Sequence, residues 1–148
     1  NNLTDPKIIE KLYKASQAGV KIDMIIRGVC CLIPGVKDLS ENIRVISIVG
    51  RYLEHARFFI FENDKNPSYF ISSADWMVRN LDHRIEVAVP IIDPVIKKEL
   101  IDIINIQLKD NQKARILDGE LSNKYVPSAK ATSFKSQEET YKFLKGKR

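Results

Sequence analysis

Hydrophobic and polar positions alternate with two different periods along this chain, which predicts a mixture of helices and strands. Apolar residues recur every three to four positions, the helical spacing, over residues 5–19 and 93–109, and again after Ser136 at Tyr141, Phe143 and Leu144. Asp5 and Asp93 each precede a proline, a typical helix start. Ser136 and Glu139 have the spacing of a capping box. We therefore predict helices in these segments.

Short β-branched and aromatic runs predict strands in the remaining segments. The predicted strands cover residues 20–26, 43–49, 56–61, 69–72, 84–91 and, more weakly, 114–117. The strand over 84–91 places Ile85, Val87 and Val89 on one face. The second helix carries an apolar stripe that we expect to be buried: Ile96, Leu100, Ile103, Ile104 and Leu108. Residues 74–82 fit a loop or a short helix. The order of elements predicts an α/β or α+β fold with a mixed sheet flanked by helices.

Composition narrows the class of protein. A chain of 148 residues with 44% hydrophobic and 29% charged residues is the size and type of one globular domain. It contains no apolar run of about 18 residues and no export signal. The neighbouring Cys30 and Cys31 are poorly placed for a disulfide, which favours a reducing, cytoplasmic setting. Because the chain begins at Asn1 rather than Met, we expect a segment of a longer polypeptide.

Charge is distributed unevenly. Basic and acidic residues balance over 1–108, so the net charge of +5 comes from residues 109–148. This basic segment could attract polyanions or could simply be solvated. Six of the eight arginines lie between Arg27 and Arg84, where lysine is scarce. Since the guanidinium fork matches phosphate and carboxylate, these arginines indicate either an anion site or a set of structural ion pairs.

The strongest chemical signal surrounds His55. A P-loop, a dinucleotide fingerprint, H-E-x-x-H and G-x-S-x-G are all missing from the sequence. His55 and Arg57 lie at the entrance of an apolar strand and share a face, as phosphoryl-group handling requires. Ser72 and Ser73, at the end of the next strand, could add donors. The alternative is a structural His55 paired with Glu54 or Asp75.

The pattern H-x-[K/R] followed by S-S-x-[N/D] resembles a phospholipase D superfamily half-site. Nearly the whole chain also resembles the C-terminal domain of bacterial polyphosphate kinases. The segments that carry this resemblance are N-L-T-D at 2–5, L-Y-K-A-S-Q-A-G-V at 12–20, I-I-R-G-V-C-C-L-I-P-G at 25–35, I-S-I-V-G-R-Y-L-E-H-A-R at 46–57, S-S-A-D-W-M-V-R-N-L-D-H-R-I-E-V at 72–87 and E-L-S-N-K-Y-V-P at 120–127.

The resemblance implies a phospholipase D-like mixed sheet flanked by helices, and a phosphotransferase activity. The family moves the terminal phosphate of ATP reversibly to polyphosphate through a phosphohistidine, with Mg²⁺. By motif, Arg27 matches a nucleotide- and phosphate-binding arginine, His55 a second active-site histidine, and Arg84 an arginine of the phosphate tunnel. Arg57 is a candidate phosphate ligand from the H-x-[K/R] geometry. His83 is expected to be an exposed structural residue.

The same resemblance sets expectations for partners. The phosphorylated histidine and the Mg²⁺ ligands belong to a preceding domain that nothing here matches, so we expect this chain to be inactive by itself. ATP, ADP and polyphosphate are the expected ligands, within a homo-oligomeric enzyme that is cytoplasmic or peripheral at the inner membrane. We divide the chain into residues 1–127, the domain proper, and 128–148, its basic C-terminal helix or tail.

Two alternatives stay open at this point. The chain could be a non-catalytic polyanion-binding module, or a phospholipase D-type phosphodiesterase half-site. Arg57 and Glu62 depart from the lysine and aspartate of the phosphodiesterase pattern H-x-K-x4-D, which weighs against cleavage. Aromatic residues occupy core-like positions rather than a basic stripe, so we expect no nucleic acid partner.

Overall fold

The computed structural model describes residues 1–127 and 132–147, whose strands form two three-stranded sheets. The first sheet has the order β1-β2-β6, with bounds Ile22–Ile25, Ile43–Ile48 and Ala114–Leu117. β1 runs parallel to β2, and β6 runs antiparallel to it. The second sheet is antiparallel, with β3, β4 and β5 at Phe58–Phe61, Ser68–Ser72 and Ala88–Pro90. The predicted mixed α/β class is confirmed, with two sheets in place of one.

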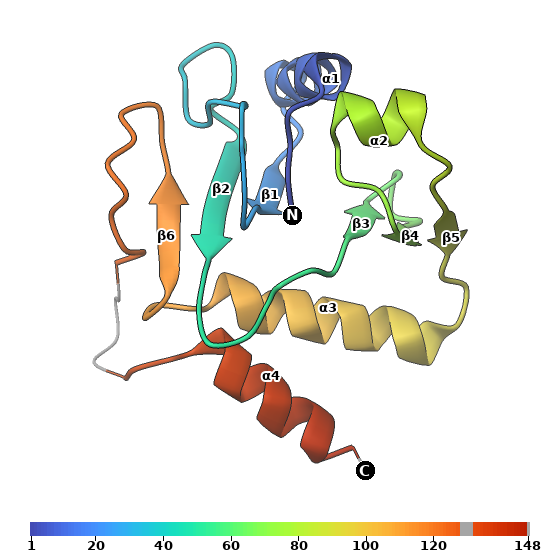
Figure 1. Ribbon diagram of the computed structural model, residues 1–148, viewed down its shortest axis with the longest axis vertical. Helices are drawn as coiled ribbons and strands as arrows, with labels where there is room; N and C mark the ends of the chain where they lie inside the picture. The colour runs from blue at the N-terminus through green and yellow to red at the C-terminus, as the bar shows by residue number, and fades with distance from the viewer. Residues whose placement is uncertain (128–131, 148) are drawn as a thin grey trace.

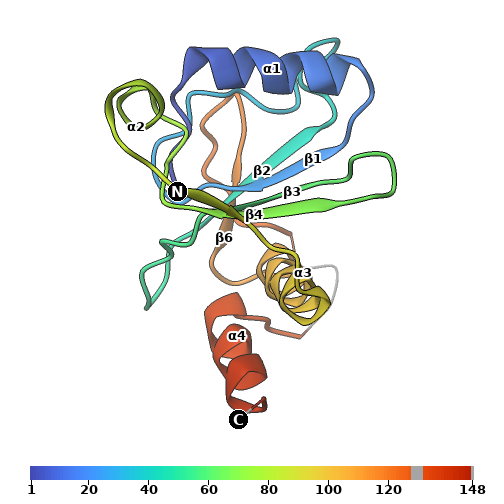
Figure 2. The same cartoon turned by 90° about the vertical axis from the view of Figure 1, so that its right-hand side faces the viewer.

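Helices cover both faces of this strand layer. In Figures 1 and 2, α1 (Pro6–Gln17) and α2 (Val78–His83) lie on one side of the strands, while α3 (Pro94–Leu108) and α4 (Ser136–Lys145) lie on the other. Both Asp-Pro starts are confirmed by their caps. The Asp5 carboxylate accepts from the Ile8 amide at 2.9 Å, and Asp93 accepts from the Val95 and Ile96 amides at 2.7 and 3.1 Å.

The main core lies between α1 and the first sheet. Its fully buried members are Leu3, Ile26, Leu32, Ile43 and Val45. Trp76 packs against this core and stacks on Phe59 of β3 with ring centroids 4.7 Å apart. This aromatic contact joins the second sheet to the core of the first, so residues at the ends of both sheets are held in a fixed relation.

The first five residues connect the loop after β1 to the loop after β4. The Leu3 amide donates to Val29 O at 2.9 Å, and the Cys31 amide donates back to Leu3 O at 2.9 Å. On the other side, the Thr4 amide donates to Trp76 O at 2.8 Å. Asn1 and Asn2 are thereby placed between two loops that are far apart in the sequence.

The predicted strand over 84–91 is too long. Only Ala88–Pro90 pairs as β5, because Ser73 engages the preceding backbone: its amide donates to Val87 O, and its hydroxyl accepts from the Val87 amide. The chain therefore joins the sheet only at Ala88. The apolar face of this segment is exposed. Ile85 is fully exposed to solvent, and the side chains of Val87 and Val89 are 58% and 50% exposed.

Two helix predictions also need correction. The α3 stripe is only partly buried: Ile96 is 46% exposed, whereas Leu100, Ile103, Ile104 and Leu108 are half-buried. Ser136 and Glu139 do not form a capping box, because Lys135 occupies the N-cap position and the Ser136 hydroxyl donates to Asp110.

The proposed division after residue 127 falls beside residues 128–131, which lie outside the described part of the chain. None of the helices among the described residues has the length and hydrophobicity that a membrane crossing requires.

Candidate functional site

Arg27 lies just beyond the carboxyl end of β1, where open α/β sheets tend to bind ligands. Its Nε donates to Asn1 Oδ1 at 2.9 Å, and Nη2 donates to the same oxygen. Nη1 has no hydrogen-bond partner among the described residues. The guanidinium is thus held along one edge, and its other edge is available to an anion.

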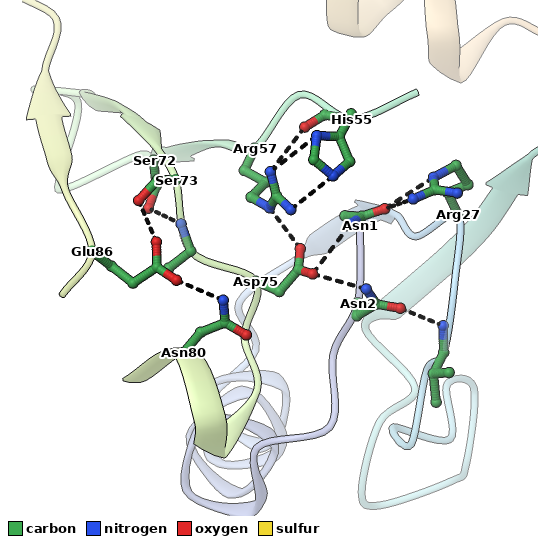
Figure 3. Close-up of polar contacts among 12 residues, drawn as sticks. Asn1, Asn2, Arg27, His55, Arg57, Ser72, Ser73, Asp75, Asn80 and Glu86 are labelled. Carbon is green, nitrogen blue, oxygen red and sulfur yellow. Dashed lines mark hydrogen bonds and ion pairs between the residues drawn. The ribbon is translucent and has the colours of Figure 1, made fainter. Parts of the chain in front are cut away.

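Asp75 is the centre of the polar network shown in Figure 3. Its side chain is only 5% exposed and accepts hydrogen bonds from Arg57 Nε at 2.7 Å, Asn2 Nδ2 at 2.8 Å and Asn1 Nδ2 at 3.1 Å. Burial alone would raise the pKa of Asp75, but these hydrogen bonds and the charge of Arg57 outweigh it and lower the pKa to about 2. Asp75 is therefore an anion that fixes its neighbours.

Arg57 connects Asp75 to His55. Arg57 Nη2 lies 3.1 Å from His55 Nε2, and Arg57 Nη1 donates to the His55 carbonyl at 3.2 Å. A guanidinium can only donate, so the ring nitrogen that meets Nη2 acts as the acceptor. All three guanidinium nitrogens of Arg57 have protein partners, whereas the His55 ring is exposed.

Arg27, Asn1, Asp75, Arg57 and His55 thus form one continuous chain of hydrogen bonds, here called the Arg27–His55 network. Figure 3 shows Arg27 and His55 on the same side of Asp75. The structure brings together three of the four predicted site residues. A guanidinium with one nitrogen unpartnered among the described residues and an exposed imidazole, joined by one hydrogen-bond network, can bind and stabilise a phosphate-type anion.

Arg84, the fourth predicted residue, lies at the end of α2 outside this network. The charge of Arg84 acts on Glu86, whose oxygens accept from the Ser73 hydroxyl and from Asn80 Nδ2, the latter at 2.6 Å. These hydrogen bonds lower the pKa of Glu86, and the nearby Arg84 and Arg57 lower it further. The Ser72 hydroxyl accepts from the Ala74 amide at 3.0 Å, so both serines shape the loop.

The structural pairing considered for His55 is not the one that forms. Glu54 turns away and accepts from Gln107 and Gln137, while Asp75 pairs with Arg57. Sequence reasoning assigned no site role to Asn1 or Asn2. The only signal for them was the N-L-T-D segment, which says nothing of a contact 73 residues away. Among the described residues, no three His, Cys, Asp or Glu side chains cluster as metal ligands would.

The chain matches one protein family in sequence and in structure. The model of "Polyphosphate kinase C-terminal domain 2" matches residues 1–137. Polyphosphate kinases of Vibrio parahaemolyticus and Escherichia coli are 57% and 49% identical over 145 residues, which is 98% of this chain and 21% of each relative.

The crystal structure of polyphosphate kinase from Porphyromonas gingivalis superposes with a TM-score of 0.95 at 49% identity. That match covers 99% of this chain and 22% of the solved one. The chain thus spans about a fifth of the length of the relatives it matches. The resemblance drawn from the sequence motifs is confirmed: this chain belongs to the polyphosphate kinase family, as a C-terminal domain.

Proposed function

We propose that this domain forms the phosphate-binding wall of an enzyme that reversibly transfers the terminal phosphate of ATP to polyphosphate. The observation that carries the proposal is the Arg27–His55 network, which leaves Arg27 Nη1 without a partner among the described residues and the His55 ring exposed, both on the same side of Asp75 in Figure 3. Arg27 would neutralise phosphate oxygens. His55 would donate to, or exchange a proton with, the oxygen that gains charge during transfer.

Other components of the reaction are proposed to lie outside this chain. A phosphohistidine and the Mg²⁺ ligands would come from the preceding domain of the full-length enzyme, itself a homo-oligomer. Mg²⁺ would supply charge neutralisation at the transferred phosphate. Arg84 would line the path of the polyphosphate chain, and Arg57, besides holding His55, remains a candidate phosphate ligand.

Binding tests the proposal directly. We expect calorimetric titration of the folded 148-residue chain to show saturable binding of short-chain polyphosphate and of ATP with Mg²⁺. Arg27→Ala should weaken that binding about tenfold, since it removes one charge-assisted hydrogen bond. Arg44→Ala is the matched control, because it removes the same charge from an exposed ion pair with Asp23.

Equal weakening by both arginine substitutions, together with loss of binding at high salt, would instead indicate a diffuse polyanion-binding module. If the chain hydrolyses a chromogenic phosphodiester and His55→Ala abolishes that hydrolysis, the domain is a phosphodiesterase of the phospholipase D type.

Catalysis by the isolated chain is a separate prediction. We expect no incorporation of label from γ-labelled ATP and Mg²⁺ into the 148-residue chain, because the phosphorylated histidine is proposed to lie elsewhere. The full-length kinase, assayed in parallel, should become labelled. Labelling of the isolated chain that disappears in His55→Ala would show that this histidine is itself the phosphorylated group.

A further inference from the structure

The segment that carries His55, residues 50–56, has little support of its own. Among the described residues, its backbone makes no hydrogen bond to another backbone group. Tyr52 and Leu53 are 52% and 71% exposed, so the segment is not anchored by burial either. Arg57 holds His55 at one end of this segment, so a further contact is needed to fix the residues before His55.

Gln137, in the first turn of α4, supplies that support. Its Oε1 accepts from the Tyr52 amide at 3.0 Å, and its Nε2 donates to the Tyr52 carbonyl at 2.7 Å. The side-chain amide therefore pairs with the backbone as a neighbouring strand would. Gly50 is needed for this approach, because a Cβ at Gly50 would lie 2.5 Å from Gln137 Oε1. Figure 1 shows the segment passing beside the start of α4.

Glu54, directly before His55, adds a second attachment. Gln137 Nε2 also donates to Glu54 Oε1 at 2.8 Å, and Gln107 Nε2 of α3 donates to Glu54 Oε2 at 3.3 Å. The carboxylate is thus held by amides from both helices on this side of the strands. Since Glu54 and His55 are adjacent, fixing one limits the positions open to the other.

Gln137 is itself held rigidly. Asp110, which is 1% exposed, accepts from the Ser136 amide at 2.8 Å and from the Ser136 hydroxyl at 2.7 Å. The other Asp110 oxygen accepts from the amides of Gln112, Lys113 and Ala114. A buried carboxylate with this many donors fixes the first turn of α4 against the start of β6.

We infer that α4 is a positioning element for the candidate active site, and that Gln137 is the positioning residue that holds the His55 segment through Tyr52 and Glu54. The inference rests on the proposed function of His55. It assigns a role in phosphoryl transfer to a helix that, among the described residues, makes no hydrogen bond to the Arg27–His55 network.

The test uses the full-length kinase with Gln137→Ala. We expect kcat to fall on the order of tenfold with little change in the KM for ATP, since displacing a catalytic group impairs the reaction more than binding. Amide hydrogen exchange should quicken at Tyr52, whose amide donates to Gln137, and stay unchanged in α1. Gly50→Ala should reproduce both effects without altering α4. Lys142→Ala, which breaks only an exposed pair with Glu139, is the control.

A double-mutant cycle with His55→Ala separates positioning from general destabilisation. If Gln137 acts through His55, Gln137→Ala should cause no further loss of kcat in the His55→Ala enzyme. The same fractional loss in both backgrounds would overturn the inference. If Gln137→Ala has the kcat and the hydrogen exchange of the wild type while His55→Ala has a lowered kcat, the inference about Gln137 is wrong and the proposed function still stands. Wild-type kcat in His55→Ala would overturn both.

Discussion

Replacing His55 with alanine in the full-length kinase is expected to lower kcat for phosphoryl transfer about 10²- to 10⁴-fold, the range that a positioned acid–base group supplies. The ring is exposed, and Arg57 orients it through contacts to Nε2 and to the backbone carbonyl. Alanine removes the ring but leaves Arg57 bound to Asp75. The loss should therefore be one of chemistry rather than of folding, and steady-state kinetics in both directions would measure it.

His83→Ala is the matched control for this prediction. His55 and His83 are the two histidines of the chain, and both are exposed. His83 ends α2, outside the Arg27–His55 network. We expect kcat of His83→Ala to stay within about twofold of wild type, because surface substitutions away from a site have small effects. Equal losses for the two histidines would contradict a specific role for His55.

The sequence predicted the local features of this fold well because their causes are local. The caps at Asp5 and Asp93 depend on residues within three positions, and both form as expected. Arg27 and His55 each end or open an apolar run, so their placement after β1 and before β3 followed from the run itself. That the two residues share one network did not follow from any local pattern.

The features that could not be predicted depend on contacts between distant segments. Asp75 binds Arg57 rather than His55, and residues 1–5 bring Asn1 and Asn2 against its other oxygen. The apolar alternation through Val87 indicates a face but not whether any segment covers it, and here that face is exposed. Ser136 had the spacing of a cap, yet a buried Asp110 26 residues earlier takes its hydroxyl. Spacing alone carries no information about such competing partners.

The second large effect is expected at Asp75. Asp75→Ala should lower the free energy of unfolding of the 148-residue chain by about 3–5 kcal/mol, the usual cost of leaving one member of a buried ion pair without its partner. Arg57 is only 15% exposed and would lose its carboxylate, while Asn1 and Asn2 would lose a shared acceptor. Urea unfolding at neutral pH would measure this. Asp82→Ala, which breaks an exposed pair with Lys7, should cost less than about 1 kcal/mol.

The same carboxylate predicts how stability depends on pH. The folded-state pKa of Asp75 is about 2 and its ordinary value is 3.8, so the contribution is fully present above about pH 4 and is lost as pH falls toward 2. The free energy of unfolding should fall by about 2 kcal/mol over this pH interval. This loss is smaller than that caused by Asp75→Ala, because protonated Asp75 can still accept hydrogen bonds. Asp75→Asn should flatten the stability profile between pH 2 and 4 relative to wild type. If the wild-type and Asp75→Asn profiles remain parallel across that interval, Asp75 is not the anion that holds Arg57 and, through it, His55.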